Sequence, residues 1–561
     1  MKVPPIKSTR PPIRFASNAS PIDAGFGLTH ASTLVATTDD VFESVTGAAV
    51  ALSVNGRSTC ARIAELELGP GSYEAEVCMD AAGGTAPRTV ARLILIDAAQ
   101  VKRAFGARYT SLDYDQPVVV GPGLGDGEDR YVPWSSLWED GPHQDVVIDF
   151  DGPHKLIFWR GTGYVPAWAV DNVLTTNFFA ETVEPGVYRD CCEPMSDREC
   201  RYSRVRIVHS SPARAVIHWR YALCDADYRI CRDYWVDEML YVYPDGVAVR
   251  NCTIHLDPND PDIWVTCGTT GRRMPVPMTS GVPGKRSFSN TEFITVNPPG
   301  SSSEAVTPAE AFTILDLEDF EQTVAWPRPP DFKEESMPML EHYLYRMNYR
   351  DRPGVFLTTH TEGLKLLFQA NEGMVYLAFE DVARDYWDRS TAVPGRFADF
   401  IHWPITRGHW TRSISDAAMY LDRPTHTFLG YSTADAVHVT EQGDATWRWF
   451  CGMVPLDQKG LRARARSWHV PPALDKMQYD ADQAAYVVER IEGGLFLTST
   501  DQPVCRPTFV VDGVSELAVR ITADGHEVPC AIGVERSGGN ARTVISVDAT
   551  IAAGTQIRLQ G

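Results

Sequence analysis

Strand-like alternation is the feature that most constrains the fold of this 561-residue chain. Short runs rich in Val, Ile, Tyr, Trp and Thr, bounded by Gly, Pro or Asp, recur along it, as in HKLIFWRG, AVIHWRYALC and GMVYLAFE. Such runs are typical of β-strands. The segment MLYVYPDGVAVRNC predicts two strands around a Pro-Asp-Gly turn. We therefore expect an all-β protein.

Helical periodicity is scarce, and only two short stretches predict helices, Glu334–Met347 and Asp457–Ser467. The strand pattern divides the chain into three expected parts. Residues 1–107 and 473–561 each predict a small β-sandwich. Residues 108–472 hold most of the Trp and His and are too long for one small sandwich. We expect this part to be a large antiparallel β-sandwich that carries catalysis.

The charge balance excludes several classes of partner. Lys and Arg number 52 and Asp and Glu 73, so the net charge is −21. This balance argues against binding to nucleic acid and to anionic membrane surfaces. No apolar run reaches the roughly 18 residues of a membrane span, and the N-terminus lacks the apolar region of a signal peptide. We expect a cytoplasmic protein, for which a homo-oligomer stays open.

The cysteines and histidines do not predict a metal site. Seven of the 12 Cys lie between Cys191 and Cys267, but no two are spaced as CxxC. We expect mostly reduced, buried thiols. The spacing of His402, His409 and His426 is irregular for metal binding. We expect neither a metal nor a cofactor.

Two neighbouring segments, CRYSRVRIVHS and AVIHWRYALC, predict a functional surface. Alternation places Tyr202 and Arg206 on one face of the first strand, and His218 and Arg220 on one face of the second. The short connector SSPAR makes the strands antiparallel neighbours, so all four side chains can share a face. Two arginines beside a base and a phenol suit a substrate that bears a carboxylate. The alternative is a structural network in which the arginines pair with acids such as Glu193 or Asp197.

Other candidates lie in loops. The Gly-rich segment RGTGYVPAWAVDN places Tyr164, Trp168 and Asn172 at the expected rim of a pocket. Further along, His402 and Trp403 belong to a His- and Trp-rich stretch. There Trp403 is expected to be a platform for a sugar ring, and the alternative is hydrophobic packing under a long loop.

The central part resembles a known family. The motifs are EPMSD…CRYSRVRI, AVIHWRYAL, DYWVDEMLYVYPDGVAVR, FIHWP…DRPTHT and SWHVPP, within roughly residues 150–475. They resemble bacterial proteins from polysaccharide-degradation loci, the group of ulvan-type uronate lyases and the related oligosaccharide dehydratase. The resemblance implies β-elimination on a uronate-containing oligosaccharide, which gives a 4,5-unsaturated uronate. The leaving group, a sugar for a lyase or water for a dehydratase, stays open.

Elimination needs a group that neutralises the uronate carboxylate, a base for the C5 proton and an acid for the departing oxygen. The residues expected to bind the carboxylate are Arg206, Arg220 and Asn172. The expected base is His218, or His402 from a facing loop. The expected acid is Tyr202 or Tyr164, whose phenol pKa we expect a neighbouring Arg to lower.

Two other classes of function stay open. A glycoside hydrolase would use paired carboxylates. Its candidate pairs are Asp149 with Asp151, Glu193 with Asp197, and Asp237 with Glu238. Alternation puts the last pair on opposite faces of a strand, which weakens it. The other class is a non-catalytic carbohydrate-binding protein.

Overall fold

The structure is a computed structural model, and nearly all of the regular structure that it describes is β-strand, so the predicted all-β class is confirmed. The described residues are 13–16, 33–38, 41–44, 49–69, 71–79, 88–96, 105–110, 117–120, 130–133, 145–160, 163–170, 173–176, 179–184, 187–188, 192–197, 200–225, 227–266, 271, 273–275, 287–289, 291–297, 303–324, 340–359, 367–369, 374–378, 408–411, 425–433, 438–488, 495–512, 520–537 and 540–560. Neither α-helix in this part is long and apolar enough to cross a bilayer.

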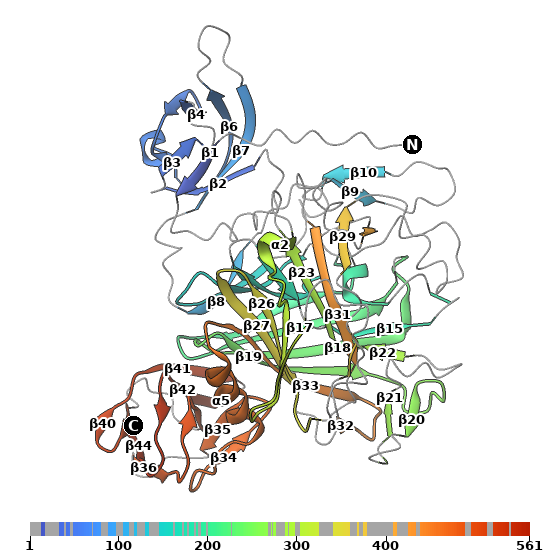
Figure 1. Cartoon of the computed structure of the whole chain (residues 1–561), viewed down its shortest axis with the longest axis vertical. Coiled ribbons are helices and arrows are strands. Elements are labelled where there is room, and N and C mark those ends of the chain that lie inside the picture. Colours follow the sequence, from blue (N-terminus) through green and yellow to red (C-terminus); the bar gives the residue numbers. More distant parts are fainter. Residues whose placement is uncertain are drawn as a thin grey trace.

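The first part of the chain forms a five-stranded sheet at one end of the molecule (Figure 1). The order is β2–β7–β6–β4–β5, in which only β2 and β7 run parallel. Leu52, Leu66 and Leu93 are fully buried in a core of its own. The elements are β1 (Ile13–Ala16), β2 (Thr33–Thr37), β3 (Val41–Ser44), β4 (Val50–Val54), β5 (Arg57–Thr59), η2 (Ile63–Leu66), β6 (Gly71–Met79) and β7 (Arg88–Ile96).

Two ten-stranded antiparallel sheets form the central sandwich (Figure 1). The β12 sheet has the order β30–β29–β31–β23–β14–β13–β12–β11–β8, with β28 beside β31. Its strands are β8 (Gly106–Thr110), β11 (Asp145–Asp149), β12 (Lys155–Phe158), β13 (Pro166–Val170), β14 (Val173–Thr176), β23 (Thr291–Asn297), β28 (Leu367–Gln369), β29 (Met374–Ala378), β30 (Gly408–Thr411) and β31 (Thr425–Thr433). The predicted boundary at residue 107 falls inside β8.

The β18 sheet has the order β16–β17–β18–β19–β33–β27–β26–β24–β25, with β32 beside β33. Its strands are β16 (Arg204–Ser210), β17 (Ala215–Cys224), β18 (Ile230–Val242), β19 (Val247–His255), β24 (Phe312–Leu315), β25 (Glu321–Val324), β26 (Leu344–Tyr349), β27 (Arg352–Thr359), β32 (His438–Val439) and β33 (Ala445–Val454). A helix was predicted over Glu334–Met347. The prediction is wrong for the end of this range, because strand β26 begins at Leu344. Residues 334–339 lie outside the described part.

Three short strand pairs and two small helices complete the central part. They are β9 (Pro117–Val120) with β10 (Arg130–Pro133), β15 (Glu181–Val183) with β22 (Ser287–Ser289), β20 (Trp264–Thr266) with β21 (Arg273–Pro275), η5 (Pro194–Ser196) and α2 (Ser303–Val306).

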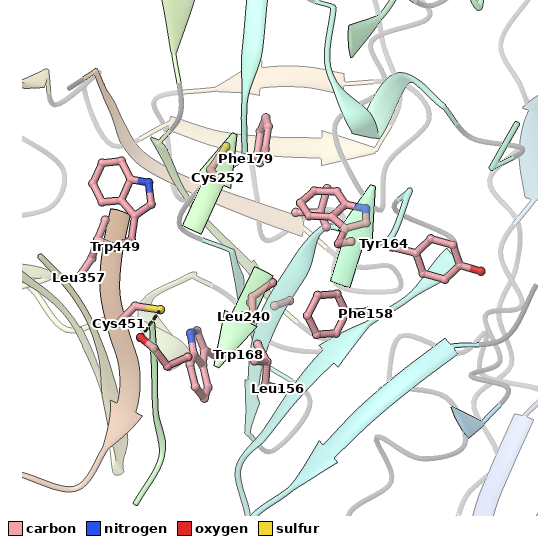
Figure 2. Packing of buried hydrophobic residues seen from close by; sticks show 14 of the residues in the cluster. Leu156, Phe158, Tyr164, Trp168, Phe179, Leu240, Cys252, Leu357, Trp449 and Cys451 are labelled. Carbon is pink, nitrogen blue, oxygen red and sulfur yellow. Dashed lines mark hydrogen bonds between the residues drawn. The ribbon is translucent and has the colours of Figure 1, made fainter. Parts of the chain in front are cut away.

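The inner faces of the two sheets share one hydrophobic core. Strands β12 and β13 are buried at every position. Figure 2 shows Leu156 of β12, Trp168 of β13 and Trp449 of β33 among the buried side chains of this core. From the β18 sheet, Trp219 and Tyr221 of β17 belong to this core. Because side chains alternate along a strand, the residues between them point to the outer face of the sheet.

One ion pair is enclosed in this core. Arg250 of β19 binds Glu238 of β18, and Tyr221 donates to the same carboxylate at 2.7 Å. All three residues are at most 1% exposed. A buried charge is tolerated only when it is paired and hydrogen-bonded. We therefore regard this group as structural.

The C-terminal part packs on the outer face of the β18 sheet through helix α5 (Gln458–His469) (Figure 1). The Asp457 side chain caps the helix by accepting from the Gly460 N–H at 2.7 Å. The helix predicted here is confirmed. One buried cluster joins helix and strands and includes Phe356, Phe450, Leu461, Ala465 and Trp468.

Two sheets and a short strand pair follow α5. A five-stranded sheet has the order β34–β35–β38–β42–β41, and a four-stranded sheet has the order β36–β44–β39–β40. The strands are β34 (Gln478–Asp480), β35 (Ala485–Val488), β36 (Leu495–Ser499), β37 (Val504–Cys505), β38 (Thr508–Asp512), β39 (Arg520–Ala523), β40 (His526–Glu527), β41 (Cys530–Ser537), β42 (Asn540–Val547), β43 (Thr550–Ile551) and β44 (Gln556–Gln560).

The C-terminal part is fastened to the sandwich by a buried ion pair. Arg214, which precedes β17, is fully buried and donates to both oxygens of Glu535 in β41, at 2.8 and 2.7 Å. It also donates to the Gln483 side chain at 2.9 Å, and Arg542 donates to Glu535 at 2.7 Å.

The cysteines that the structure describes carry free thiols. Six of them are buried, and these are Cys192, Cys200, Cys224, Cys231, Cys252 and Cys451. The prediction of reduced, buried thiols is confirmed for these six.

Acid is expected to destabilise the fold partly through His154. This side chain stacks on Phe150, and burial, followed by the Lys155 charge, lowers its pKa from 6.5 to about 4. Between these values the unfolded state binds the proton more readily. The contribution of neutral His154 is therefore complete above about pH 6.5 and is lost as the pH falls toward about 4, by about 3 kcal/mol.

Denaturant unfolding from pH 7 to pH 4 measures this effect. His154→Leu should flatten the decline in the free energy of unfolding, whereas the same slope in wild type and variant would contradict the assignment. His526→Gln, at an exposed position in β40, is the matched control.

Candidate active site

Strands β16 and β17 carry most of the predicted site. They are antiparallel neighbours, with Arg206 opposite His218 and Arg204 opposite Arg220. Trp219 lies in the core, so His218 and Arg220 on either side of it lie on the outer face. The structure thus brings Arg206, His218 and Arg220 together on the side of the β18 sheet that points away from the β12 sheet.

Asp237 of β18 lies at the centre of this surface. Its Oδ1 accepts from Nε2 of His218 at 2.7 Å. Its Oδ2 accepts from Nη1 of Arg220 at 2.6 Å and from Nε2 of His255 in β19 at 2.9 Å. The other nitrogen of His255, Nδ1, lies 2.9 Å from Oδ1 of Asp444, in the turn before β33. Donors from β17 and β19 therefore converge on the Asp237 carboxylate, and the turn before β33 binds one of these donors, His255.

Arg206 covers the remaining nitrogen of His218. Its Nε donates to Nδ1 of His218 at 3.1 Å. Since Nε2 of His218 donates to Asp237, the hydrogen bonds assign a neutral imidazole with its lone pair on Nδ1. Arg206 is exposed on an edge strand, and in the described part of the chain no carboxylate lies within ion-pair distance of it. Its guanidinium is thus available to an external anion.

We call the connected side chains the Asp237 cluster: Arg206, His218, Arg220, Asp237, His255 and Asp444. They remain within reach of a solute, since His218 is 19% exposed, Asp237 24% and His255 41%. The cluster is therefore a surface feature of the sheet.

The contacts fix the charges of the cluster. Partial burial opposes ionisation of Asp237, but hydrogen bonds from His218 and His255 outweigh it and lower the pKa of Asp237 to about 2. Burial likewise opposes charge on His255, yet its bonds to Asp237 and Asp444 raise its pKa. At neutral pH the centre of the cluster is an anion.

The C-terminal part borders the cluster. Met239 and Asn251 continue across the sheet from His218 to Arg448 of β33. There Asn251 donates to the Asp482 carbonyl at 2.8 Å, and Arg448 pairs with the Asp482 side chain.

Tyr202 lies beside the cluster, but its phenol differs from the expectation. The ring meets Trp235 edge-on at 6.2 Å, and the hydroxyl donates to the carbonyl of Tyr228 at 2.8 Å. Partial burial is the main cause that raises the pKa of Tyr202. The prediction of a phenol pKa lowered by a neighbouring Arg is therefore wrong.

Tyr164 and Trp168 do not line a pocket rim. They are 1% and 2% exposed, and Figure 2 shows both among the buried side chains of the sandwich. Burial raises the pKa of the Tyr164 phenol. Neither residue can touch a substrate on the outer face, because both belong to the core between the sheets.

Three predicted site residues, Asn172, His402 and Trp403, lie outside the described residues.

Four of the six carboxylates of the hydrolase alternative have structural partners, and these are Asp149, Asp197, Asp237 and Glu238. Asp149 is buried and binds Arg108 and Lys155. Asp197 is buried and accepts three backbone N–H groups, those of residues 201, 202 and 203. Asp237 and Glu238 point to opposite faces, as predicted. Arg220 does pair with an acid, but that acid is Asp237, neither Glu193 nor Asp197.

Sequence reasoning missed two members of the cluster, His255 and Asp444, and the link from Asp237 to His218. A signal was present in β18 and β19: the alternation that gives Trp235 and Asp237 one face also gives Thr253 and His255 one face. Nothing near Asp444 indicated its contact, because it lies 189 residues from His255.

The arrangement can bind an anion and move a proton. An imidazole that a carboxylate holds on one nitrogen is the usual form of a general base once its other nitrogen is released to the substrate, and in His218 that nitrogen, Nδ1, is bound by Arg206. Among the described residues, no group of three or more His, Cys, Asp or Glu could hold a metal ion.

Comparison with known proteins leaves the family open, because no family model and no curated protein matches the chain. Solved structures with weak similarity include galactose 1-epimerase from Lactobacillus acidophilus NCFM, with 8% identity and a TM-score of 0.22 over 60% of this chain and 98% of that chain. Another is an alpha-mannosidase from Enterococcus faecalis V583, with 8% identity and a TM-score of 0.27 over 91% of this chain and 51% of that chain. Similarities this low do not identify a function.

Proposed function

We propose that the protein is a carbon–oxygen lyase that acts by β-elimination on uronic-acid-containing oligosaccharides. The observation that carries the proposal is the hydrogen-bonded chain from Arg206 through His218 to Asp237. It supplies a cation for the uronate carboxylate and a base for the neighbouring proton. The motifs that resemble the ulvan-type uronate lyase and dehydratase group support the same reaction.

Arg206 recognises the substrate. A guanidinium binds a carboxylate best through two parallel N–H bonds. A uronate carboxylate that takes the Nε edge of Arg206 replaces Nδ1 of His218 as the acceptor. The lone pair of Nδ1 becomes free at the moment when the substrate is in place. Pairing with Arg206 also makes the C5 proton more acidic, because the developing charge spreads onto a neutralised carboxylate.

His218 performs both proton transfers. Its Nδ1 takes the C5 proton, the C5–H electrons form the C4–C5 double bond, and the C4–O bond breaks. The imidazolium then returns the proton to the departing oxygen, which leaves as water or as a sugar hydroxyl. Tyr202 has a structural role in this scheme, because its hydroxyl proton is donated to the Tyr228 carbonyl.

Asp237 holds the imidazole in the productive tautomer. It keeps the proton on Nε2 and stabilises the imidazolium that forms on Nδ1 protonation. Because the bonds from His218 and His255 keep the pKa of Asp237 near 2, it stays ionised throughout the working range of an imidazole base.

Arg206→Gln should lower kcat/KM on a uronate oligosaccharide by about 10- to 100-fold, which is the loss of one charge-assisted hydrogen-bonded contact. Arg206→Lys keeps the charge without the planar pair of donors, so its activity should lie between those of the wild type and Arg206→Gln. Arg88→Gln, on the exposed surface of the first sheet, is the control. Full activity in Arg206→Gln would contradict the assignment.

The reaction is tested by its product. The protein is incubated with uronate oligosaccharides and with the same oligosaccharides after their carboxyl groups are reduced to alcohols. The ultraviolet absorbance of the unsaturated uronate should rise only with the carboxylate substrate. New reducing ends without that absorbance would indicate hydrolysis and overturn the proposal.

A further inference from the structure

We propose that His255 and Asp444 form a positioning pair that acts through Asp237 and sets the pH at which His218 is available as a base. The inference deepens the proposed function and rests on it only for the activity readout. Neither residue needs to touch the substrate.

The geometry gives His255 two carboxylate partners. Its Nε2 lies 2.9 Å from Asp237 Oδ2, and its Nδ1 lies 2.9 Å from Asp444 Oδ1. An imidazole that donates from both nitrogens is an imidazolium. His255 thus places a positive charge directly against the carboxylate that holds His218.

Asp444 is held firmly. The Asp444 N–H donates to the Thr440 hydroxyl at 3.1 Å, and the Thr440 N–H donates to the Asp444 carbonyl at 2.9 Å. The turn passes through Gly443 at φ 93°, where a Cβ would lie 2.8 Å from the Leu256 carbonyl oxygen. The Asp444 carboxylate is therefore built into the turn and orients His255 from the side opposite Asp237.

The charged groups that face His255 in the described structure are few. Asp237 faces it from β18 and Asp444 from the turn before β33. Through Asp237, the next cation is Arg220 of β17, and the next titratable group is His218 of the same strand. Trp235 of β18 is its strand partner and carries no charge.

His255 influences the protonation of His218 because both imidazoles bind the same carboxylate, that of Asp237. Oδ2 of Asp237 accepts hydrogen bonds from Arg220 and His255, and Oδ1 accepts one from His218. While His255 is charged, it offsets part of the Asp237 charge and repels a second proton on His218. His218 then stays neutral, and able to accept a proton, at lower pH. When the charge on His255 is removed, His218 is protonated at higher pH.

Two variants weaken the positive charge on His255, one by replacing His255 itself and one by replacing a carboxylate that binds it. His255→Gln removes the cation and keeps a donor toward Asp237. Asp444→Asn leaves Asp237 untouched and removes one of the two carboxylates that keep His255 charged. Thr253→Val, two residues before His255 on the same face of β19, is the matched control. Each protein is labelled in its His side chains, and the titration of His218 is followed by NMR beside the pH profile of kcat/KM.

In both variants, but not in Thr253→Val, the midpoint of the His218 titration and the acid limb of the profile should move up by about one pH unit, as expected for unit charges a few ångströms apart near a surface. An unchanged His218 titration in folded Asp444→Asn would overturn the inference. A shifted titration in a protein without elimination activity would support the inference and contradict the proposed function.

Discussion

His218→Gln should lower turnover of a uronate oligosaccharide by about 10²–10⁴-fold, the usual contribution of a general base. Gln keeps a donor toward Asp237 but cannot accept the C5 proton. The fold should persist, because His218 is on the outer face and outside the buried core. The measurement is the initial rate of ultraviolet absorbance from the unsaturated product.

A matched control separates chemistry from stability. His526→Gln removes an exposed imidazole in the C-terminal part and should keep the wild-type rate. Unfolding in denaturant should give similar free energies for both variants. Near-full activity in His218→Gln would remove His218 as the base.

Glu535→Leu should lower the free energy of unfolding by about 3–5 kcal/mol, the usual cost of leaving a buried charge without its partner. Arg214 is fully buried and donates to both Glu535 oxygens. Without Glu535, the Arg214 charge keeps hydrogen bonds to the Gln483 amide oxygen and the Tyr243 hydroxyl and its contact with the Tyr241 ring, and none of these groups is an anion. The C-terminal part should therefore be held less firmly on the sandwich.

The double variant Arg214→Met with Glu535→Leu tests the cause. A hydrophobic pair of similar volume avoids the unpaired charge and should recover most of the lost stability. Denaturant unfolding measures all three proteins. A double variant as unstable as Glu535→Leu would show that shape at this contact matters more than the ion pair. Arg506→Gln, at a partly exposed pair with Asp548, is the control.

The pairing of β16 with β17 could be predicted because both strands alternate and the connector is short. With Trp219 and Tyr221 buried, a slip by one residue would turn His218 and Arg220 into the core, so burial fixes the register. Helical periodicity over Asp457–Ser467 predicted helix α5, and the structure adds its Asp457 cap and its buried side.

The burial of Tyr164 and Trp168 in the core could not be predicted from alternation in the sequence. Strand β13 is buried on both faces, so its sequence lacks alternation, and Gly161 and Gly163, which precede Tyr164 and the strand, make the segment resemble a loop. The links of Asp237 to His255 and Asp444 depend on strands that meet only in the folded sheet. Alternation along β16 and β17 therefore predicted which side chains share a sheet face. The hydrogen bonds of the Asp237 cluster depend on contacts between strands that are distant in the sequence.

In the proposed elimination, His218 removes a proton from C5 of a bound uronate. This proton transfer is tested with an oligosaccharide that carries deuterium at C5 of the uronate, and the product is analysed by NMR and mass spectrometry. We expect an unsaturated product without that deuterium and a slower rate than with hydrogen, both depending on His218. A product that keeps the deuterium and carries a new reducing end would contradict the account.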